Sequence, residues 1–285
     1  MATGTAEFAV FGQEFYFEES IRAIEALADA SESERPAERI AELLPHPSQE
    51  TRLRVASKIA QRFFRPPDAR ISAVPFLRLV KGTKDESSRR YLLYWRTART
   101  DRVIAAIAGD IFYPYFVLNT TPSGFDEAAF NQANTGTLLT VDRIISRDFV
   151  AEYSERIWRF ESARTLTLAL RIMRQAEILD AVSTNIAGRR VLGYYPMPSC
   201  IRPEIFAYCM CEELFAGPEA VPMPSLDQVQ NGDCAKLFLL SRLHVDSLLK
   251  SLDRKNLIEI VSLPGGRYIR AMSPDALVDR LLLAM

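Results

Sequence analysis

The segment from Cys234 to Met272 constrains the fold of this chain more than any other stretch. Four apolar residues recur in it at helical spacing: Val245, Leu248, Leu249 and Leu252. One face of a helix there therefore packs inward. A β-branched run, Leu257 to Val261, follows, and Pro264-Gly265-Gly266 separates it from a second strand-like run, Arg267 to Arg270. Because glycine takes positive φ without penalty, the two glycines predict a hairpin tip. The order helix, turn, helix, strand, turn, strand is typical of a winged helix.

The outward face of this helix and the second strand carry the residues that we expect to contact DNA. A recognition helix in the major groove presents polar and basic side chains to bases and phosphates. On the helix from His244 to Asn256 these side chains are Ser247, Lys250, Ser251 and Arg254. On the predicted wing they are Arg267 and Arg270, which we expect to contact the phosphate backbone.

Charge is distributed unevenly, although the formal net charge of the 285 residues is only −1. Residues 1–49 hold ten acidic and three basic residues, which gives −7, whereas residues 50–110 hold six acidic and fourteen basic residues, which gives +8. Residues 232–285 hold six acidic and eight basic residues, which gives +2. A local excess of positive charge suits a phosphate backbone. Solvated basic helix faces produce the same pattern, and both interpretations stay open.

A basic helix is predicted from Gln49 to Phe64, with Ser48 as its N-cap. Val55, Ile59 and Phe63 form its apolar stripe. On another face a basic residue recurs every four positions: Arg54, Lys58 and Arg62. Such a row can lie along a phosphate backbone, as a contact independent of base sequence, or it can simply be a solubilising face. Arg89 and Arg90, in the same basic segment, are further candidates for DNA contacts.

A second helix-turn-helix-like unit is predicted near residues 162–195. Ser162 caps a helix whose outward face carries Arg164, Arg171 and Arg174. The polar end of this helix, from Arg174, leads into the apolar Ile178 and Leu179, where a strand is predicted to begin. Residues 189–195 are predicted to form the return strand of a second wing.

Three segments follow from these patterns. Residues 1–47 form an acidic N-terminal segment with short helices, 48–216 a basic helical domain, and 225–285 a C-terminal winged helix. The stretch from Gly217 to Pro224 contains three prolines and is the predicted linker. The expected fold class is mainly α with small β wings: a helical N-terminal domain followed by winged-helix or helix-turn-helix modules.

Candidate catalytic and metal-binding residues are few. The only histidines are His46 and His244, and Cys209 and Cys211 stand in an apolar helical stretch where small core residues are expected. The glycine-rich loops that bind nucleotide phosphates are not present in the sequence. We therefore expect no catalytic residue, no metal site and no cofactor. The expected location is the cytoplasm, without a membrane span, since Asp110 and Pro114 interrupt the longest apolar stretch.

Several short stretches together suggest a family. They are Thr51 to Val55 before the basic helix, Tyr91 to Trp95 before a further helix, Ser162 to Leu166, and Arg174 to Leu179. In this order they resemble the BrxA family of the BREX phage-defence systems, over about residues 48–215. The resemblance implies a small, non-enzymatic, mostly helical protein that binds double-stranded DNA. It also implies a role beside other proteins of the defence system.

A protein-interaction scaffold is the alternative. Winged helices also bind proteins, and Asp246 and Asp253 on the predicted recognition helix weaken its attraction to DNA. The acidic residues 1–49 could contact a basic partner protein or the chain's own residues 50–110.

Overall fold

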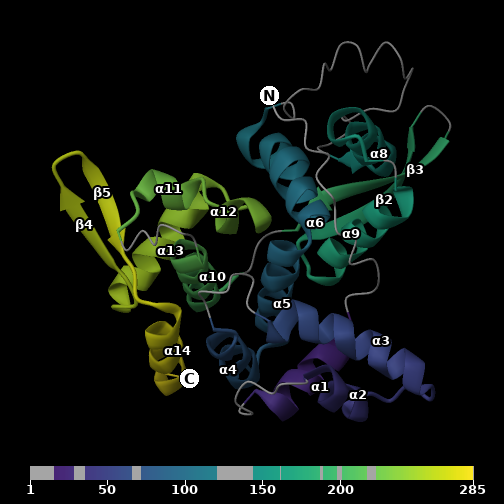
Figure 1. The fold of residues 1–285 in the computed structure, drawn as a ribbon. Helices are drawn as coiled ribbons and strands as arrows, with labels where there is room; N and C mark the ends of the chain where they lie inside the picture. The colour runs from purple at the N-terminus through teal and green to yellow at the C-terminus, as the bar shows by residue number, and fades with distance from the viewer. Residues whose placement is uncertain are drawn as a thin grey trace. The chain divides into compact units, whose positions relative to one another are not determined.

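The computed structural model describes residues 16–28, 36–65, 72–120, 144–160, 162–186, 189–197, 201–216 and 223–284. It is mainly helical and contains two small antiparallel sheets, of three and two strands (Figure 1), which confirms the predicted class of mainly α with small β elements. Most of the predicted linker, residues 217–222, lies outside the described residues. Among the residues described, no helix has the length and apolarity needed to cross a bilayer.

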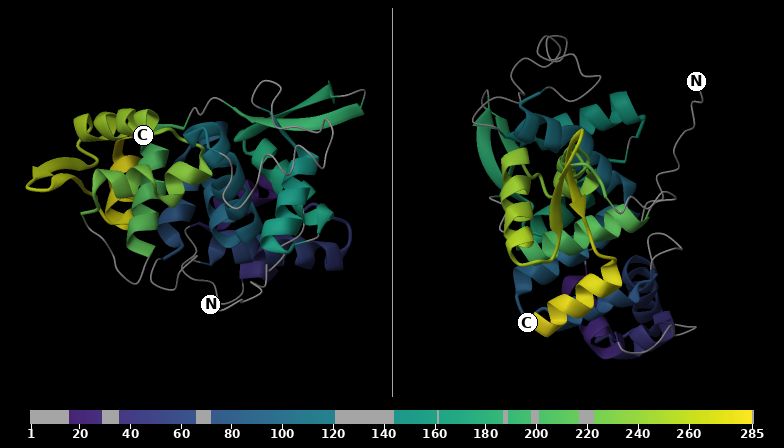
Figure 2. Two further views of the ribbon diagram at one scale, coloured as in Figure 1. Left: turned by 90° about the horizontal axis from the view of Figure 1, so that it is seen from above. Right: turned by 90° about the vertical axis from the view of Figure 1, so that its left-hand side faces the viewer.

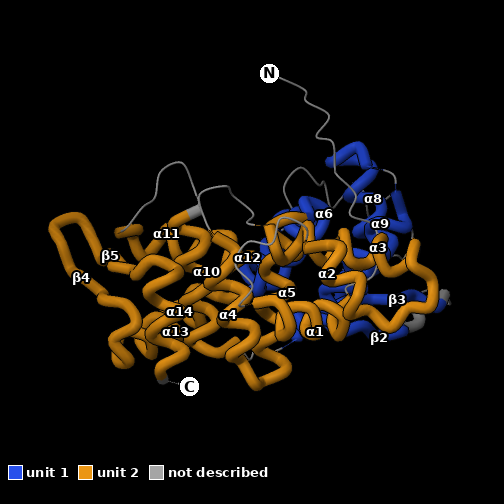
Figure 3. The backbone as a smooth tube through the Cα atoms, turned by 60° about the horizontal axis from the view of Figure 1, so that its bottom comes forward, with its two compact units in different colours: residues 1–14, 101–199, 237–239 blue, residues 15–100, 200–236, 240–285 orange. Residues whose placement is uncertain are grey.

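The chain divides into two compact units (Figure 3). Unit 1 contains residues 1–14, 101–199 and 237–239, and unit 2 contains residues 15–100, 200–236 and 240–285. These limits do not coincide with the predicted segment boundaries at 47 and 216. The reason is packing: helices from the first hundred residues pack against helices from the last eighty-six.

Unit 2 is built from helices and one hairpin. Its elements are α1 (Phe17–Leu27), α2 (Pro36–Leu43), α3 (Gln49–Ile59), the π-helix η1 (Ala60–Phe64), α4 (Val74–Gly82), α5 (Glu86–Thr100), α10 (Pro203–Ala216), α11 (Leu226–Gln230), α12 (Asp233–Leu237), α13 (Arg242–Arg254), β4 (Glu259–Leu263), β5 (Gly266–Arg270) and α14 (Pro274–Ala284). Helix α5 packs against α10, and α14 packs against both α4 and α10. The predicted helix from Gln49 to Phe64 is therefore present, but its last turn is π-helical.

Large side chains of α4, α5 and α10 form the core of unit 2. Tyr94, Trp95 and Phe76 are completely buried, as is Tyr208 on α10. The aromatic cluster at residues 91–95 thus belongs to the core and does not form a surface on which bases could stack. Ser48 accepts a hydrogen bond from the Thr51 backbone N–H at 3.4 Å and confirms the predicted N-cap of α3.

Unit 1 combines short helices with a three-stranded sheet. Its elements are α6 (Arg102–Ala106), the π-helix η2 (Ile107–Leu118), β1 (Ile145–Ser146), α8 (Arg147–Tyr153), the π-helix η3 (Ser154–Trp158), α9 (Ala163–Gln175), β2 (Leu179–Ile186) and β3 (Arg189–Pro196). The strand order is β1-β3-β2, and all pairs are antiparallel. Gly193 on β3 is needed for close packing, since a Cβ there would lie 2.0 Å from Cγ2 of Ile144.

Candidate nucleic-acid interface

Helix α13 forms where the apolar spacing predicts it, although it begins and ends two residues earlier than expected. Ser241 caps it by accepting a hydrogen bond from the His244 backbone N–H at 3.2 Å. The predicted inward face is buried, with Val245, Leu248, Leu249 and Leu252. Burial of this face fixes the rotation of the helix and therefore determines which side chains point outward.

The outward face of α13 carries the residues predicted to contact DNA. Ser247, Lys250 and Arg254 are exposed, and Ser251 is half-buried. In the part of the chain that the structure describes, neither Lys250 nor Arg254 has an ion-pair partner. Leu243, at the start of the same stripe, is 82% exposed. Sequence reasoning missed this residue, although its spacing of four, seven and eleven positions from Ser247, Lys250 and Arg254 places it on their face.

The two aspartates of α13 are held by hydrogen bonds within unit 2. Asp246 accepts a hydrogen bond from the side-chain amide of Gln230 at 2.7 Å. Asp253 accepts one from the backbone N–H of Ile260 at 3.0 Å. Both aspartates are half-buried, and helical spacing places them together along one edge of the outward face, beside Lys250. The central stripe of α13 is therefore cationic and polar, although the helix as a whole carries both signs of charge.

The β4–β5 hairpin stands next to α13. Its register pairs Glu259 with Arg270 and Leu263 with Gly266, so the turn falls where the glycines predict it. Gly265 has φ +105° and Gly266 φ +146°, values that L side chains rarely adopt. The first strand starts two residues later than predicted: pairing begins at Glu259, and the preceding Leu257 and Ile258 are buried outside the strand. Figure 2 shows the hairpin extending outward from the neighbouring helices.

The base of the hairpin is fixed and its tip is exposed. Ile269 is completely buried, and its backbone N–H donates to the Pro224 carbonyl oxygen at 2.9 Å. Arg270 forms an ion pair with Glu259 at 2.6 Å across the two strands. Arg267 is exposed beside the glycine turn. Of the two predicted wing arginines, Arg267 is thus the one without an ion-pair partner among the described residues.

The predicted basic row on α3 is only partly at the surface. Arg54 is exposed and Lys58 is half-buried, but Arg62 is only 2% exposed. The prediction that Arg62 contacts DNA is therefore wrong. Arg62 lies in η1, where i→i+5 hydrogen bonding turns the backbone less per residue than an α-helix does, so it leaves the face of Arg54 and Lys58. Burial, followed by the charges of Arg62 and Arg54, lowers the pKa of Lys58.

Arg89 and Arg90 on α5 are engaged in contacts within unit 2. Arg89 forms an ion pair with Glu25 of α1 at 2.9 Å and donates a hydrogen bond to the Thr83 carbonyl oxygen. Arg90 pairs with Glu86, and its guanidinium lies 5.0 Å from the ring centroid of Phe17. These contacts neutralise both charges, so the two arginines contribute less to a DNA-binding surface than the sequence indicates.

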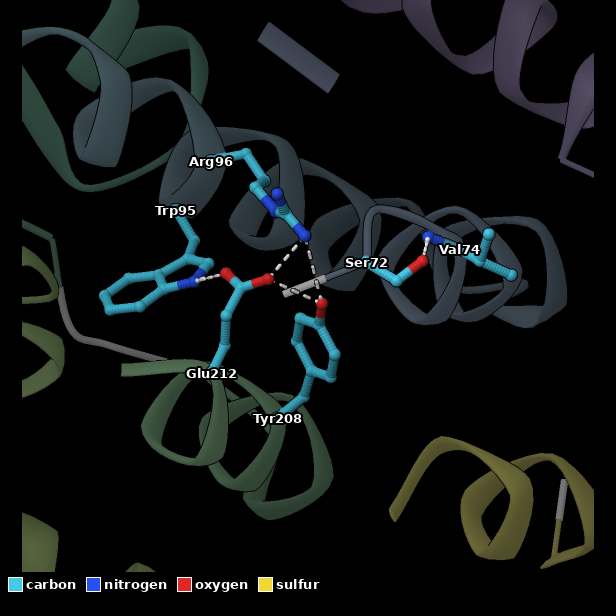
Figure 4. Close-up of polar contacts among 6 residues, drawn as sticks. All are labelled: Ser72, Val74, Trp95, Arg96, Tyr208 and Glu212. Atoms are coloured by element: carbon cyan, nitrogen blue, oxygen red, sulfur yellow. Dashed lines mark hydrogen bonds and ion pairs between the residues drawn. The ribbon is translucent and has the colours of Figure 1, made fainter. Parts of the chain in front are cut away.

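A further arginine forms part of a buried cluster (Figure 4). Arg96 lies 2.5 Å from Glu212, and both side chains are completely buried. Trp95 Nε1–H and Tyr208 Oη–H donate to the same carboxylate at 2.5 and 2.8 Å. Burial disfavours the charge of Arg96, but the attraction of Glu212 outweighs it and raises the pKa of the guanidinium. Among the described basic residues at 50–110, Arg62 and Arg96 are therefore absent from the surface, so the charge of +8 overstates the positive charge that this segment exposes.

Helix α9 of unit 1 presents its arginines as predicted. Ser162 accepts a hydrogen bond from the Thr165 backbone N–H at 3.3 Å and caps the helix. Arg164, Arg171 and Arg174 are exposed. Arg174 also lies 4.0 Å from Asp180 of β2. The helix is followed by the β2–β3 hairpin, so helix and hairpin follow one another here as they do in α13, β4 and β5.

The cysteines form no metal site among the described residues. Cys209 and Cys211 on α10 are completely buried, as predicted for core residues, and Cys234 is 2% exposed. Burial raises the pKa of all three thiols. Within the described ranges, no group of three or more His, Cys, Asp or Glu side chains could hold a metal ion.

Comparisons with known proteins give little further information. No family model matches the chain, and no curated protein does. A magnesium-bound crystal structure of SspB is similar to it, with 11% sequence identity and a TM-score of 0.49, over 99% of this chain and 87% of that one. A likeness at this level supports no statement about function.

Proposed function

We propose that this protein is a non-enzymatic, double-stranded DNA-binding protein. In this proposal residues 225–285 are a winged helix, with α13 as the recognition helix and the β4–β5 hairpin as the wing. Ser247, Lys250, Ser251 and Arg254 face the major groove, and Arg267 contacts the phosphate backbone. Arg270 contributes to the wing through its ion pair with Glu259.

The observation that carries the proposal is the composition of the outward stripe of α13. Lys250 and Arg254 are exposed and without ion-pair partners among the described residues, while Asp246 and Asp253 are held at one edge by Gln230 and Ile260. Unpaired cations are available to displace counterions from a phosphate backbone, whereas paired ones would first have to break their contacts. Neither aspartate pairs with Lys250 or Arg254 among the described residues, so these two cations are available to a phosphate backbone.

Two other basic surfaces support the proposal. Arg54 and Lys58 of α3 offer a second contact in unit 2 that is independent of base sequence. Arg164, Arg171 and Arg174 of α9 offer a third in unit 1, where helix and hairpin together suggest a second helix-turn-helix-like module. Arg89 and Arg90 do not belong to these surfaces, because Glu25 and Glu86 pair with their side chains.

The test is a duplex-binding titration at several salt concentrations. The double variant Lys250→Ala/Arg254→Ala removes two cations that displace counterions at the groove, so the slope of log K against log salt falls by about 1.8 in magnitude. If the two proteins bind equally at about 1 M salt, this difference in slope gives the variant an affinity about 30-fold lower at about 0.15 M salt. The matched control, Arg22→Ala/Arg39→Ala, removes two exposed arginines of α1 and α2 and leaves the slope unchanged. If the unmodified protein formed no salt-sensitive complex with duplex DNA, the proposal would be refuted.

A protein-interaction scaffold is the second candidate, and the exposed apolar residues favour it. Leu243 on α13 is 82% exposed and Leu263 on β4 is 45% exposed. Exposed leucines near a recognition surface suit contact with a protein as well as with thymine methyl groups. If the protein is a scaffold, Leu243→Asp abolishes co-purification of a partner protein, while Lys250→Ala/Arg254→Ala does not. If Leu243→Asp leaves co-purification unchanged and Lys250→Ala/Arg254→Ala abolishes duplex binding, DNA binding is favoured.

We also propose, from the resemblance of residues 48–215 to the BrxA family, that the protein is an accessory component of a BREX-type phage-defence system. Other proteins of that system would be its partners, and the cytoplasm its location. Deletion of its gene should then raise the plating efficiency of phage on a strain that carries the defence locus. Unchanged plating and a gene neighbourhood without a defence methyltransferase would contradict this role.

A further inference from the structure

Unit 2 contains a cavity that the proposed DNA-binding surface does not use. Its volume is about 1040 Å³, just above the range of about 300–1,000 Å³ for small-molecule sites. The end of α4, the starts of α5 and α10, the residues that follow α13, and α14 all contribute to its wall. All of these segments belong to unit 2.

The floor of the cavity is aliphatic. Leu79, Ile205, Leu257 and Leu281 line it, and each is at most 5% exposed. Aromatic side chains are absent from the lining residues, so the cavity offers no ring on which a nucleobase could stack. An aliphatic group placed here would be removed from water, which stabilises it by about 0.8 kcal/mol per methylene.

The rim of the cavity is charged, and the charges do not balance. Two ion pairs are formed there: Arg202 lies 3.7 Å from Asp85, and Lys255 lies 2.5 Å from Glu204. Hydrogen bonds from Ser88 lower the pKa of Asp85, so its carboxylate is ionised near neutral pH. The two pairs neutralise their own members and leave the other cations of the rim uncompensated.

Lys84 and Arg280 are these remaining cations. Both line the cavity and are exposed, and neither has an ion-pair partner within the described ranges. Four basic and two acidic residues line the cavity, so its net charge is +2. The lining therefore carries positive charge that no described side chain neutralises and that favours an anionic group.

We propose that this cavity binds an amphiphilic anion, a molecule with an aliphatic body and a terminal phosphate or carboxylate. The body lies on the floor formed by Leu79, Ile205, Leu257 and Leu281, and the head group lies between Lys84 and Arg280. This site does not depend on DNA binding, so either proposal can fail while the other stands.

Isothermal titration calorimetry with four compounds tests the site, each below its micelle concentration. Decyl phosphate and decanoate combine tail and charge, decanol has the tail alone, and inorganic phosphate has the charge alone. We expect one or both amphiphiles to bind at least about tenfold more tightly than decanol and inorganic phosphate. A preference between them identifies the head group. Absence of binding by both amphiphiles, or equal binding of decanol, overturns the proposal.

A pair of variants locates the binding. Lys84→Ala/Arg280→Ala removes the two uncompensated cations and breaks no ion pair that the structure shows, so the variant keeps the far-ultraviolet circular dichroism and melting curve of the unmodified protein. Its affinity for the better amphiphile should fall at least about tenfold. Arg22→Ala/Arg39→Ala, which changes the net charge equally but lies outside the cavity, should leave the affinity unchanged. Equal losses in both variants would show that binding depends only on overall charge and would refute the site.

Discussion

Replacing Glu212 by Gln should lower the free energy of unfolding of unit 2 more than a surface substitution does, because it removes the counter-charge of a buried arginine. Arg96 and Glu212 are completely buried, 2.5 Å apart. Nε and Nη1 of Arg96 have no hydrogen-bond partner among the described residues, so the carboxylate is the main compensation for its charge. Breaking a buried pair by removing one partner costs about 3–5 kcal/mol, and we expect Glu212→Gln to fall in this range.

A second substitution should reverse most of this loss. Trp95 donates to one carboxylate oxygen and Tyr208 to the other, and glutamine keeps only one of these acceptors. The single variant therefore leaves the charge of Arg96 unpaired and also removes one buried hydrogen bond. Arg96→Met then removes that charge and replaces it with an apolar side chain next to Phe76, whose ring centroid lies 4.5 Å from the guanidinium. The double variant should be within about 2 kcal/mol of the unmodified protein, since apolar replacements of buried pairs are often neutral.

Urea denaturation followed by tryptophan fluorescence measures both effects. The chain has two tryptophans, Trp95 in unit 2 and Trp158 in unit 1, so a Trp158→Phe background reports on unit 2 alone. With an m value of up to about 3 kcal/mol/M, the loss lowers the midpoint by at least about 1 M. A Glu212→Gln midpoint equal to that of the background, or a double variant no more stable than the single one, would show that this charge pair does not control the stability of unit 2.

Two further predictions concern titrating groups. Burial raises the pKa of Cys211 to about 12 and raises the pKa values of Cys209 and Cys234. In a Cys200→Ser variant at about pH 8, the folded protein should therefore react with iodoacetamide at least about a hundredfold more slowly than the urea-unfolded chain. Similar rates would contradict the burial of these thiols. Burial alone would raise the pKa of Glu204, but the hydrogen bond and charge of Lys255 outweigh it and lower the value. Because the folded-state pKa lies below the unfolded one, Glu204 contributes stability above its unfolded pKa, and this contribution is lost as the pH falls through the folded pKa. Lys255→Ala should raise the pKa that carboxyl NMR measures for Glu204, and an unchanged value would show that the ion pair does not form in solution.

Local sequence patterns predicted the elements whose orientation depends on a single apolar face. The spacing of Val245, Leu248 and Leu252 placed α13, and the two glycines placed the turn of the hairpin, since both signals act between residues close in the chain. The caps at Ser48 and Ser162 were predicted for the same reason.

The predictions that were wrong or incomplete depended on contacts distant in sequence or on an unusual backbone. A helical count placed Arg62 outside, whereas the π-helix η1 turns it inward. Arg89 looked available for DNA because its partner Glu25 lies on another helix. The cavity had no sequence signal, since Lys84, Arg202, Lys255 and Arg280 come from four separate segments that meet only in the folded unit.

The discontinuity of unit 2 has a consequence during synthesis of the chain. Helix α5 is made before residues 101–199, and its packing partner α10 is made after them. At a translation rate of about 5–20 residues per second, Glu212 is synthesised roughly 6–23 s after Trp95 and Arg96. Throughout that interval the aromatic side chains of α5 that pack on α10 have no partner helix to cover them. We therefore expect nascent chains stalled between residues 100 and 200 to be bound by chaperones, and this binding to end once α10 has emerged.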